Sequence, residues 1–123
     1  MRNDLEIRNV RGKGRGVFSL VPFYRGQVIE YCPILEFPNG QATYDSVVHH
    51  YTFAWTGRRS ALALGYGSLL NHSYTPNAVY AFRMAKKIIS IRALRNIALG
   101  EEILINYNGD PKDQTPLWFD VKG

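Results

Sequence analysis

The sequence lacks the features of secreted, disulfide-stabilised and membrane-spanning proteins. Its 123 residues include a single cysteine, Cys32, so no disulfide can form within the chain. No apolar stretch is long enough to span a bilayer, and the basic residues near the N-terminus are not followed by the apolar segment of a signal peptide. These absences predict an intracellular protein in a reducing compartment, with no membrane segment.

Candidate metal ligands are also scarce. Cys32 lies in the apolar run 28–35, which predicts a buried structural thiol rather than a reactive one. The histidines are His49, His50 and His72, and their spacing with Cys32 fits no zinc site. We therefore expect no bound metal, and we expect His49 and His50 to be surface residues.

Acidic residues are few relative to basic ones. Asp and Glu together number 10 against 15 Lys and Arg, which gives a formal net charge of +5. This balance favours an anionic partner such as nucleic acid, an acidic protein or a charged cofactor. A modest surplus of one sign also keeps an ordinary domain soluble, so the charge alone leaves both interpretations open.

Long helical periodicity is absent, and short strand-like segments between turn residues take its place. A hydrophobic fraction of 46% is sufficient for the core of one domain. Strands are expected at residues 5–10, 17–18, 27–37, 51–56, 60–64, 78–84, 88–92 and 102–107, with a short helix or irregular insert at 41–50. Pro33 should lie at a bulge or a sheet edge, because proline cannot donate to a ladder. The sequence therefore predicts a mainly β domain.

Glycine is concentrated between residues 11 and 19, where Gly12, Gly14 and Gly16 occur within five residues. Such glycines allow unusual φ values and a close approach of the backbone to a ligand. The segment leads into a strand-like pair rather than a helix, so it is neither a dinucleotide fingerprint nor a P-loop. A glycine-rich hairpin loop with no ligand is the alternative interpretation.

A polar stretch, Asn71-His72-Ser73-Tyr74-Thr75-Pro76-Asn77, separates two apolar segments. Its residues form turns, because their side chains bond to the nearby backbone or because proline fixes φ. A polar loop held between core segments is a common place for functional residues. An ordinary surface turn is the alternative.

Four segments together have the order of a known family. The glycine-rich segment 12–18 is followed by Tyr51, then by Asn71-His72-Ser73 with Pro76-Asn77, and finally by residues 95–107, which end in Tyr107. This combination resembles the SET domain of protein-lysine methyltransferases over about residues 5–108. The resemblance implies the SET-domain (β-clip) fold, which is mainly β, with small twisted sheets and a C-terminal pseudoknot. Residues 1–108 would be the core, and residues 109–123 a closing tail of the same domain.

The resemblance implies S-adenosyl-L-methionine as cofactor. Lys13, Gly14 and Arg15 should line it on one side, largely through the backbone, and Asn71 and His72 should hold it on the other. Glycines let a backbone approach a ligand, and a cationic side chain can pair with the cofactor carboxylate. The tail has no cysteines for the zinc cluster of many relatives, so Trp118 or Phe119 is expected to close the site and stack on the adenine.

The same resemblance makes Tyr107 the expected catalytic residue, with Tyr51 and Ile105 beside the lysine channel. Methyl transfer from a sulfonium to an amine mainly requires alignment of the two partners. Ile105 has no hydroxyl that could hold a water in the channel, which predicts that the amine receives more than one methyl group. In one departure from the family, Asn106 occupies a position that is often Asp, which makes a local structural contact uncertain.

The predicted function is S-adenosylmethionine-dependent methyl transfer to a lysine side chain of a protein, with a histone or histone-like tail as the family default. A homodimer is expected, because a small domain leaves much apolar surface uncovered and because the chain resembles the minimal SET proteins of viruses and microbes. The alternative function is a non-catalytic module on a SET scaffold that binds a peptide or nucleic acid, which basic residues interleaved with aromatics permit.

Overall fold

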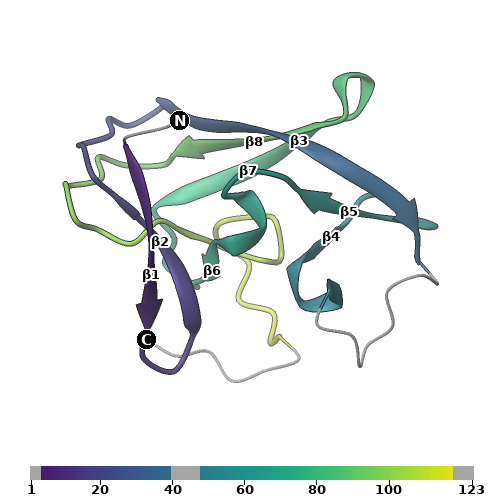
Figure 1. Cartoon of the computed structure of the whole chain (residues 1–123), viewed down its shortest axis with the longest axis horizontal. Coiled ribbons are helices and arrows are strands. Elements are labelled where there is room, and N and C mark those ends of the chain that lie inside the picture. Colours follow the sequence, from purple (N-terminus) through teal and green to yellow (C-terminus); the bar gives the residue numbers. More distant parts are fainter. Residues whose placement is uncertain (1–3, 40–47, 118–123) are drawn as a thin grey trace.

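The computed structural model describes residues 4–39 and 48–117. These residues form three β-sheets, and no α-helix occurs among them (Figure 1). Short 3₁₀ turns occur at Val48–Tyr51 (η2), Gly67–Leu69 (η3) and Met84–Lys86 (η4). The predicted mainly β class is confirmed. No helix in the described part of the chain is long and apolar enough to cross a membrane.

The first sheet is a hairpin of β1 (Leu5–Val10) and β2 (Gly14–Ser19). Its turn contains Gly12 and Gly14 at φ values of 80° and 79°, which favour glycine. β2 begins at Gly14, earlier than the pair 17–18 expected from sequence, because the antiparallel ladder with β1 extends to that residue. The predicted glycine-rich hairpin is therefore correct, but its turn is shorter than expected.

The second sheet has five antiparallel strands and contains most of the predicted strands at slightly shifted bounds. In Figure 1 it occupies the upper part of the molecule. Its strands, in spatial order, are β4 (Thr52–Ala54), β5 (Arg59–Ala63), β3 (Val28–Pro38), β8 (Ile88–Ala93) and β7 (Ala78–Arg83).

Pro33 does not occupy the predicted bulge or edge position. It lies within β3, the central strand, and the only register shift recorded between β3 and β8 falls at Val28 and Glu30. Pairing of β3 with β8 ends at Pro33, and pairing with β5 begins at Ile34. A proline is tolerated here because the strand changes partner at this point, so the missing N–H interrupts neither ladder.

The core lies on the face of this sheet that packs against the rest of the chain. Cys32, Ile89 and Ile103 have no exposed surface, and Ile91 has 1%. The expectation that Cys32 is a buried thiol is confirmed.

The third sheet consists of two short parallel strands, β6 (Asn71–His72) and β9 (Leu104–Ile105). The sequence predicted a longer strand at 102–107 and a loop at 71–77. The last segment makes only a short ladder because its hydrogen bonds are shared: the Ile103 amide donates to the Val17 carbonyl of β2, and the Ile105 carbonyl accepts from the Ser73 amide. The C-terminal segment is therefore enclosed between β2 and the polar stretch, as Figure 1 shows near its centre.

Candidate active site

The side chain of Asn77 holds the last segment in place. Its Nδ2 donates to the Glu102 carbonyl and its Oδ1 accepts from the Leu104 amide, both at 2.8 Å. Its own carbonyl accepts from the Leu94 amide at 2.8 Å. Asn77 is only 2% exposed, so water cannot replace these bonds. Its side chain supplies residues 102–104 with the backbone hydrogen-bond partners that a neighbouring strand would otherwise provide.

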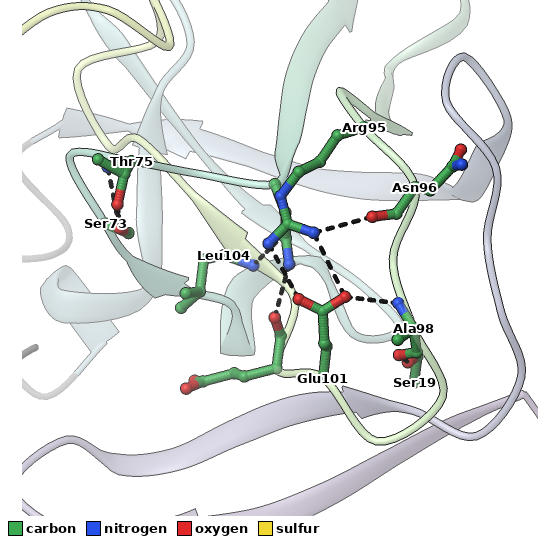
Figure 2. Close-up of polar contacts among 10 residues, drawn as sticks. Ser19, Ser73, Thr75, Arg95, Asn96, Ala98, Glu101 and Leu104 are labelled. Carbon is green, nitrogen blue, oxygen red and sulfur yellow. Dashed lines mark hydrogen bonds and ion pairs between the residues drawn. The ribbon is translucent and has the colours of Figure 1, made fainter.

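The loop before this segment is shaped by an ion pair. The Arg95 guanidinium donates to both oxygens of Glu101, at 2.9 and 3.3 Å, and the Ala98 amide donates to the same carboxylate (Figure 2). Hydrogen bonds from Arg95 and then Ala98 lower the pKa of Glu101. The Ser19 hydroxyl donates to the Ala98 carbonyl at 2.7 Å, which ties the loop to β2.

Tyr107 is fixed through three polar atoms. Its amide donates to His72 Nδ1 at 2.9 Å, its hydroxyl donates to the Leu70 carbonyl at 2.6 Å, and its carbonyl accepts from the Tyr80 hydroxyl at 3.1 Å. Burial, the charge of Glu102 and the proximity of Tyr51 together raise the pKa of Tyr107. Its hydroxyl therefore stays protonated near neutral pH and acts as a hydrogen-bond donor.

His72 connects the polar stretch to Tyr107. It is 3% exposed, and its ring lies edge-on to those of Tyr74 and Tyr107, with centroids 4.4 and 5.2 Å away. Because Nδ1 accepts a backbone hydrogen bond, the proton of the neutral ring is on Nε2. Burial, and to a lesser extent the Lys13 ammonium, lowers the pKa of His72 below the ordinary value of 6.5.

This environment predicts a specific dependence of stability on pH. The unfolded chain takes up a proton at His72 near its ordinary pKa, while the folded chain resists protonation, so the free energy of unfolding should fall as pH drops below about 6.5. Above that pH this contribution is fully present. Urea unfolding of wild type and of the non-titrating variant His72→Asn, at about pH 7.5 and pH 5.5, measures it. Equal losses in the two proteins on acidification would show that His72 has no such role.

Lys13, Asn71 and Glu102 meet beneath the glycine-rich hairpin. Glu102 accepts from Asn71 Nδ2 at 2.7 Å and lies 3.9 Å from Lys13 Nζ, and the side chains of this ion pair are only 13–14% exposed. Asn71 Nδ2 also donates to the Arg15 carbonyl at 3.0 Å. A β-carbon at Gly16 would lie 2.4 Å from the Glu102 carboxylate, so only glycine permits this approach.

The structure therefore brings the predicted cofactor residues of the hairpin together with those of the polar stretch. Arg15 contributes its carbonyl, and its side chain is exposed. A β-carbon at Gly14 would have nothing within 4 Å, so the backbone there borders open space. Trp118, the remaining predicted cofactor residue, lies outside the described residues. The cofactor roles themselves stay predictions.

Tyr107 also lines a cleft of about 760 Å³, whose lining includes neither the hairpin residues nor Asn71 and His72. Tyr51, Phe53, Tyr80, Phe82 and Tyr107 line it with aromatic side chains. The Phe53 ring lies edge-on to Tyr80, with centroids 5.0 Å apart, and edge-on to Phe82 at 6.3 Å. Tyr51 and Tyr107 thus line one cleft, and their roles at a lysine channel stay predictions.

Ile105, the other predicted channel residue, is fully buried and is not among the residues that line the cleft. The phenol hydroxyls at the cleft belong instead to Tyr51, Tyr80 and Tyr107. Sequence reasoning missed Tyr80, because a tyrosine in an apolar strand reads as a core residue. Tyr80 is therefore a further residue that can influence the number of methyl groups added.

Residues 109–117 fold back over the site. Asn106, only 2% exposed, donates from Nδ2 to the Asp113 carbonyl at 2.6 Å, and its Oδ1 accepts from the Asn108 amide at 2.9 Å. Farther along, the Thr115 carbonyl accepts from the Tyr74 hydroxyl at 3.1 Å. The side-chain amide of Asn106 thus both donates and accepts a hydrogen bond, whereas a carboxylate could only accept.

We expect Asn106→Asp to destabilise the protein by about 2 kcal/mol at neutral pH, because the aspartate keeps the acceptor but directs a buried carboxylate at the Asp113 carbonyl. Asn108→Asp is the matched control: Asn108 Nδ2 donates to the exposed Thr115 carbonyl at 3.0 Å, where water can replace it. Chemical denaturation compares the two. Similar losses from both substitutions would be inconsistent with a buried latch at Asn106.

Comparison with known proteins agrees with this arrangement. A family model described as the SET domain matches residues 14–108. The chain belongs to the SET domain family. This SET domain is 39% identical over 126 aligned residues to a Schizosaccharomyces pombe protein named "Histone-lysine N-methyltransferase, H3 lysine-37 specific". The alignment covers 98% of this chain and 80% of the relative.

A solved structure supports the same assignment. It is a candidate histone methyltransferase of Plasmodium falciparum, 30% identical, with a TM-score of 0.73 over 87% of this SET domain and 95% of the other chain. The SET-domain fold predicted from sequence is confirmed. This SET domain is a protein-lysine methyltransferase, and SET methyltransferases generally use S-adenosylmethionine as methyl donor.

Proposed function

We propose that this SET domain binds S-adenosylmethionine at the hairpin side of the site and methylates a lysine of a histone or histone-like tail from the cleft side. The observation that carries the proposal is the position of Tyr107, which lines the cleft while its backbone is bonded to His72 of the opposite side. The name of the fission yeast relative supports a histone substrate.

The residues of the hairpin side fit a cofactor that carries a carboxylate, an ammonium and an adenine. Lys13 offers a cation, and open backbone lies beside Gly14. Asn71 holds the hairpin through the Arg15 carbonyl, so the polar stretch fixes the shape of this side. When bound, the cofactor supplies an electron-poor methyl group. Lys13, Gly14, Arg15, Asn71 and His72 would hold it.

The residues of the cleft side fit a neutral lysine amine. A lysine in water has a pKa near 10.4, and an apolar aromatic channel disfavours its ammonium form. Burial raises the pKa of Tyr80, as it does that of Tyr107, so both phenols stay protonated. Tyr107 therefore presents a protonated hydroxyl, which can orient the amine. The Leu70 carbonyl, which accepts from its hydroxyl, is a further polar atom available at this point.

The number of methyl groups added stays a prediction. The expectation of more than one rested on the absence of a hydroxyl at Ile105, while Tyr80 and Tyr51 present hydroxyls at the cleft. Peptide mass spectrometry with enzyme and cofactor in excess decides the question: a product that stops at monomethyl-lysine would defeat the expectation.

Two further parts of the proposal rest on sequence. An intracellular location follows from the single cysteine, and a homodimer from the small size of the domain. Exposed apolar side chains offer surface for such a contact: Tyr31 and Leu35 on β3, and Leu64 directly after β5.

The direct experiment for the proposal has two readouts. S-adenosylmethionine should raise the melting temperature of the protein, since a ligand of the native state stabilises it. Incubation with the cofactor and histone H3 should then add methyl groups to lysine. Binding without transfer to H3 would leave the cofactor site in place and refute the histone substrate.

A further inference from the structure

Basic side chains from three segments gather at one end of the five-stranded sheet. We call this group the basic rim. It comprises Arg58 and Arg59 at the β4–β5 turn, Arg83 at the end of β7, and Lys86 and Lys87 in the β7–β8 turn. Four of these residues are exposed, and Arg59 is half-buried, with a side chain that is 41% exposed. In Figure 1 the β7–β8 turn projects beyond the rest of the molecule.

Glu36 joins the two halves of the basic rim. One of its carboxylate oxygens pairs with Arg59, and the other lies 3.7 Å from Lys87 Nζ. One carboxylate therefore contacts a cation from each of the two turns, Arg59 and Lys87. Arg83 lies over the Tyr31 ring of β3, with its guanidinium carbon 5.7 Å from the ring centroid.

β8 and β5 flank β3 on opposite sides and pair with successive halves of it: the Lys87 carbonyl accepts from the Ile34 amide, and Arg59 lies opposite Pro38. The two turns are therefore separated along β3 as well as across it, and Glu36 lies between them.

The basic rim borders the substrate cleft. Asn39, which lines the cleft, donates from its amide to the Arg58 carbonyl at 3.0 Å and from Nδ2 to the Gly57 carbonyl at 3.1 Å. Within the described residues, the cleft lining contains no Asp, Glu, Lys or Arg. The described part of the cleft lining thus carries no acidic side chain that would attract a basic tail, and the basic rim beside it repels one.

We propose that the basic rim binds the phosphate backbone of duplex DNA. Exposed cations on projecting turns are suited to phosphates, which are contacted without regard to sequence. Trp55 of the β4–β5 turn is buried, and Met84 is the exposed large apolar side chain of the two turns. The turns therefore offer few of the large apolar anchors that centre a protein interface. Bound DNA neutralises the basic rim next to the cleft.

This binding gives a reason for an uncharged cleft in an enzyme that acts on a basic chain. A histone-type tail that arrives with its DNA meets a neutralised entrance, whereas the isolated tail meets five cations. This consequence for catalysis rests on the proposed function, but DNA binding itself does not. The predicted substrate class is therefore a lysine-rich chain that is already bound to DNA.

The test measures binding of a short labelled DNA duplex by fluorescence anisotropy, without cofactor, at several salt concentrations between about 50 and 200 mM. Arg58→Ala/Lys86→Ala removes two cations of the basic rim. Arg8→Ala/Arg25→Ala removes two exposed cations elsewhere: Arg8 stacks on Phe18 of the first hairpin, and Arg25 lies near the opposite end of β8. Both variants change the net charge equally.

Wild type should bind the duplex less tightly as salt rises. The basic-rim variant should bind about tenfold more weakly or worse at moderate salt, and the slope of log K against log salt should be shallower by about two. The control should match wild type. The proposal would be overturned if wild type did not bind the duplex, or if both variants lost affinity equally. It would also be overturned if a polyglutamate peptide competed at a lower concentration of charges than DNA does.

A second measurement links the basic rim to catalysis. Histone H3 free in solution and H3 assembled on DNA are compared as substrates. Wild type should methylate the DNA-bound form faster, and the basic-rim variant should lose that ratio. A ratio unaffected by the substitution would contradict the catalytic part. Absence of transfer to either form would instead refute the proposed function, while the anisotropy result would still decide DNA binding.

Discussion

Replacing Tyr107 by phenylalanine should lower the rate of methyl transfer by about a hundredfold or more, while the protein still folds and binds cofactor. The substitution removes only the hydroxyl, which donates to the Leu70 carbonyl at 2.6 Å. The bonds of the Tyr107 backbone to His72 and Tyr80 do not depend on that hydroxyl. The loss should therefore appear in kcat.

Two measurements separate methyl transfer from cofactor binding. Single-turnover kinetics with S-adenosylmethionine and a lysine peptide gives the rate of transfer, and calorimetry gives the affinity for the cofactor. Tyr24→Phe is the matched control, because Tyr24 is 64% exposed and does not line the cleft. It should have wild-type kinetics. Near-normal turnover by Tyr107→Phe would remove Tyr107 from the catalytic role, and a loss of cofactor affinity of equal size would make it a binding residue instead.

Asn77→Ala should destabilise the fold by about 3 kcal/mol or more. It would leave the Glu102 carbonyl and the Leu104 amide without the side-chain partners that hold the last segment, and each buried unsatisfied group costs about 1–3 kcal/mol. Because Tyr107 follows this segment directly, activity should be lost at temperatures where part of the population is unfolded. Urea denaturation monitored by tryptophan fluorescence measures the change.

Asn96→Ala is the control for this prediction. Asn96 Oδ1 accepts from the Arg25 amide at 2.8 Å, but the bond is exposed and water can replace it. Its loss should cost less than about 1 kcal/mol. A small effect at Asn77, comparable to that at Asn96, would mean that the parallel pair of β6 and β9 holds the last segment without it.

Most strands of the fold are predictable from the sequence because strand-like residues between turn residues are a local signal. The segments of β1, β3, β7 and β8 carry this signal, and the structure contains each of them near its expected bounds. The pairing of β6 with β9 is not local. Asn71 and Leu104 meet across a large sequence separation, over two strands of two residues each, and no periodicity can develop in so short a ladder.

The site shows the same division. Lys13, Asn71, His72 and Tyr107 were found through motifs, and the structure brings them into one region. Glu102, which links Lys13 to Asn71, was missed because a glutamate near a turn reads as a solvated charge. Asn77 belongs to a motif, but its structural role does not follow from the sequence, because its partners are backbone groups.

The central claim is methyl transfer to a protein lysine by Tyr107-dependent alignment, and one measurement tests it directly. The folded protein is incubated with S-adenosylmethionine and histone H3, and the peptides are analysed by tandem mass spectrometry beside a parallel reaction with Tyr107→Phe. We predict methylated lysine with wild type and little or none with the variant. Unmodified H3 after incubation with wild-type protein that binds the cofactor would contradict the account.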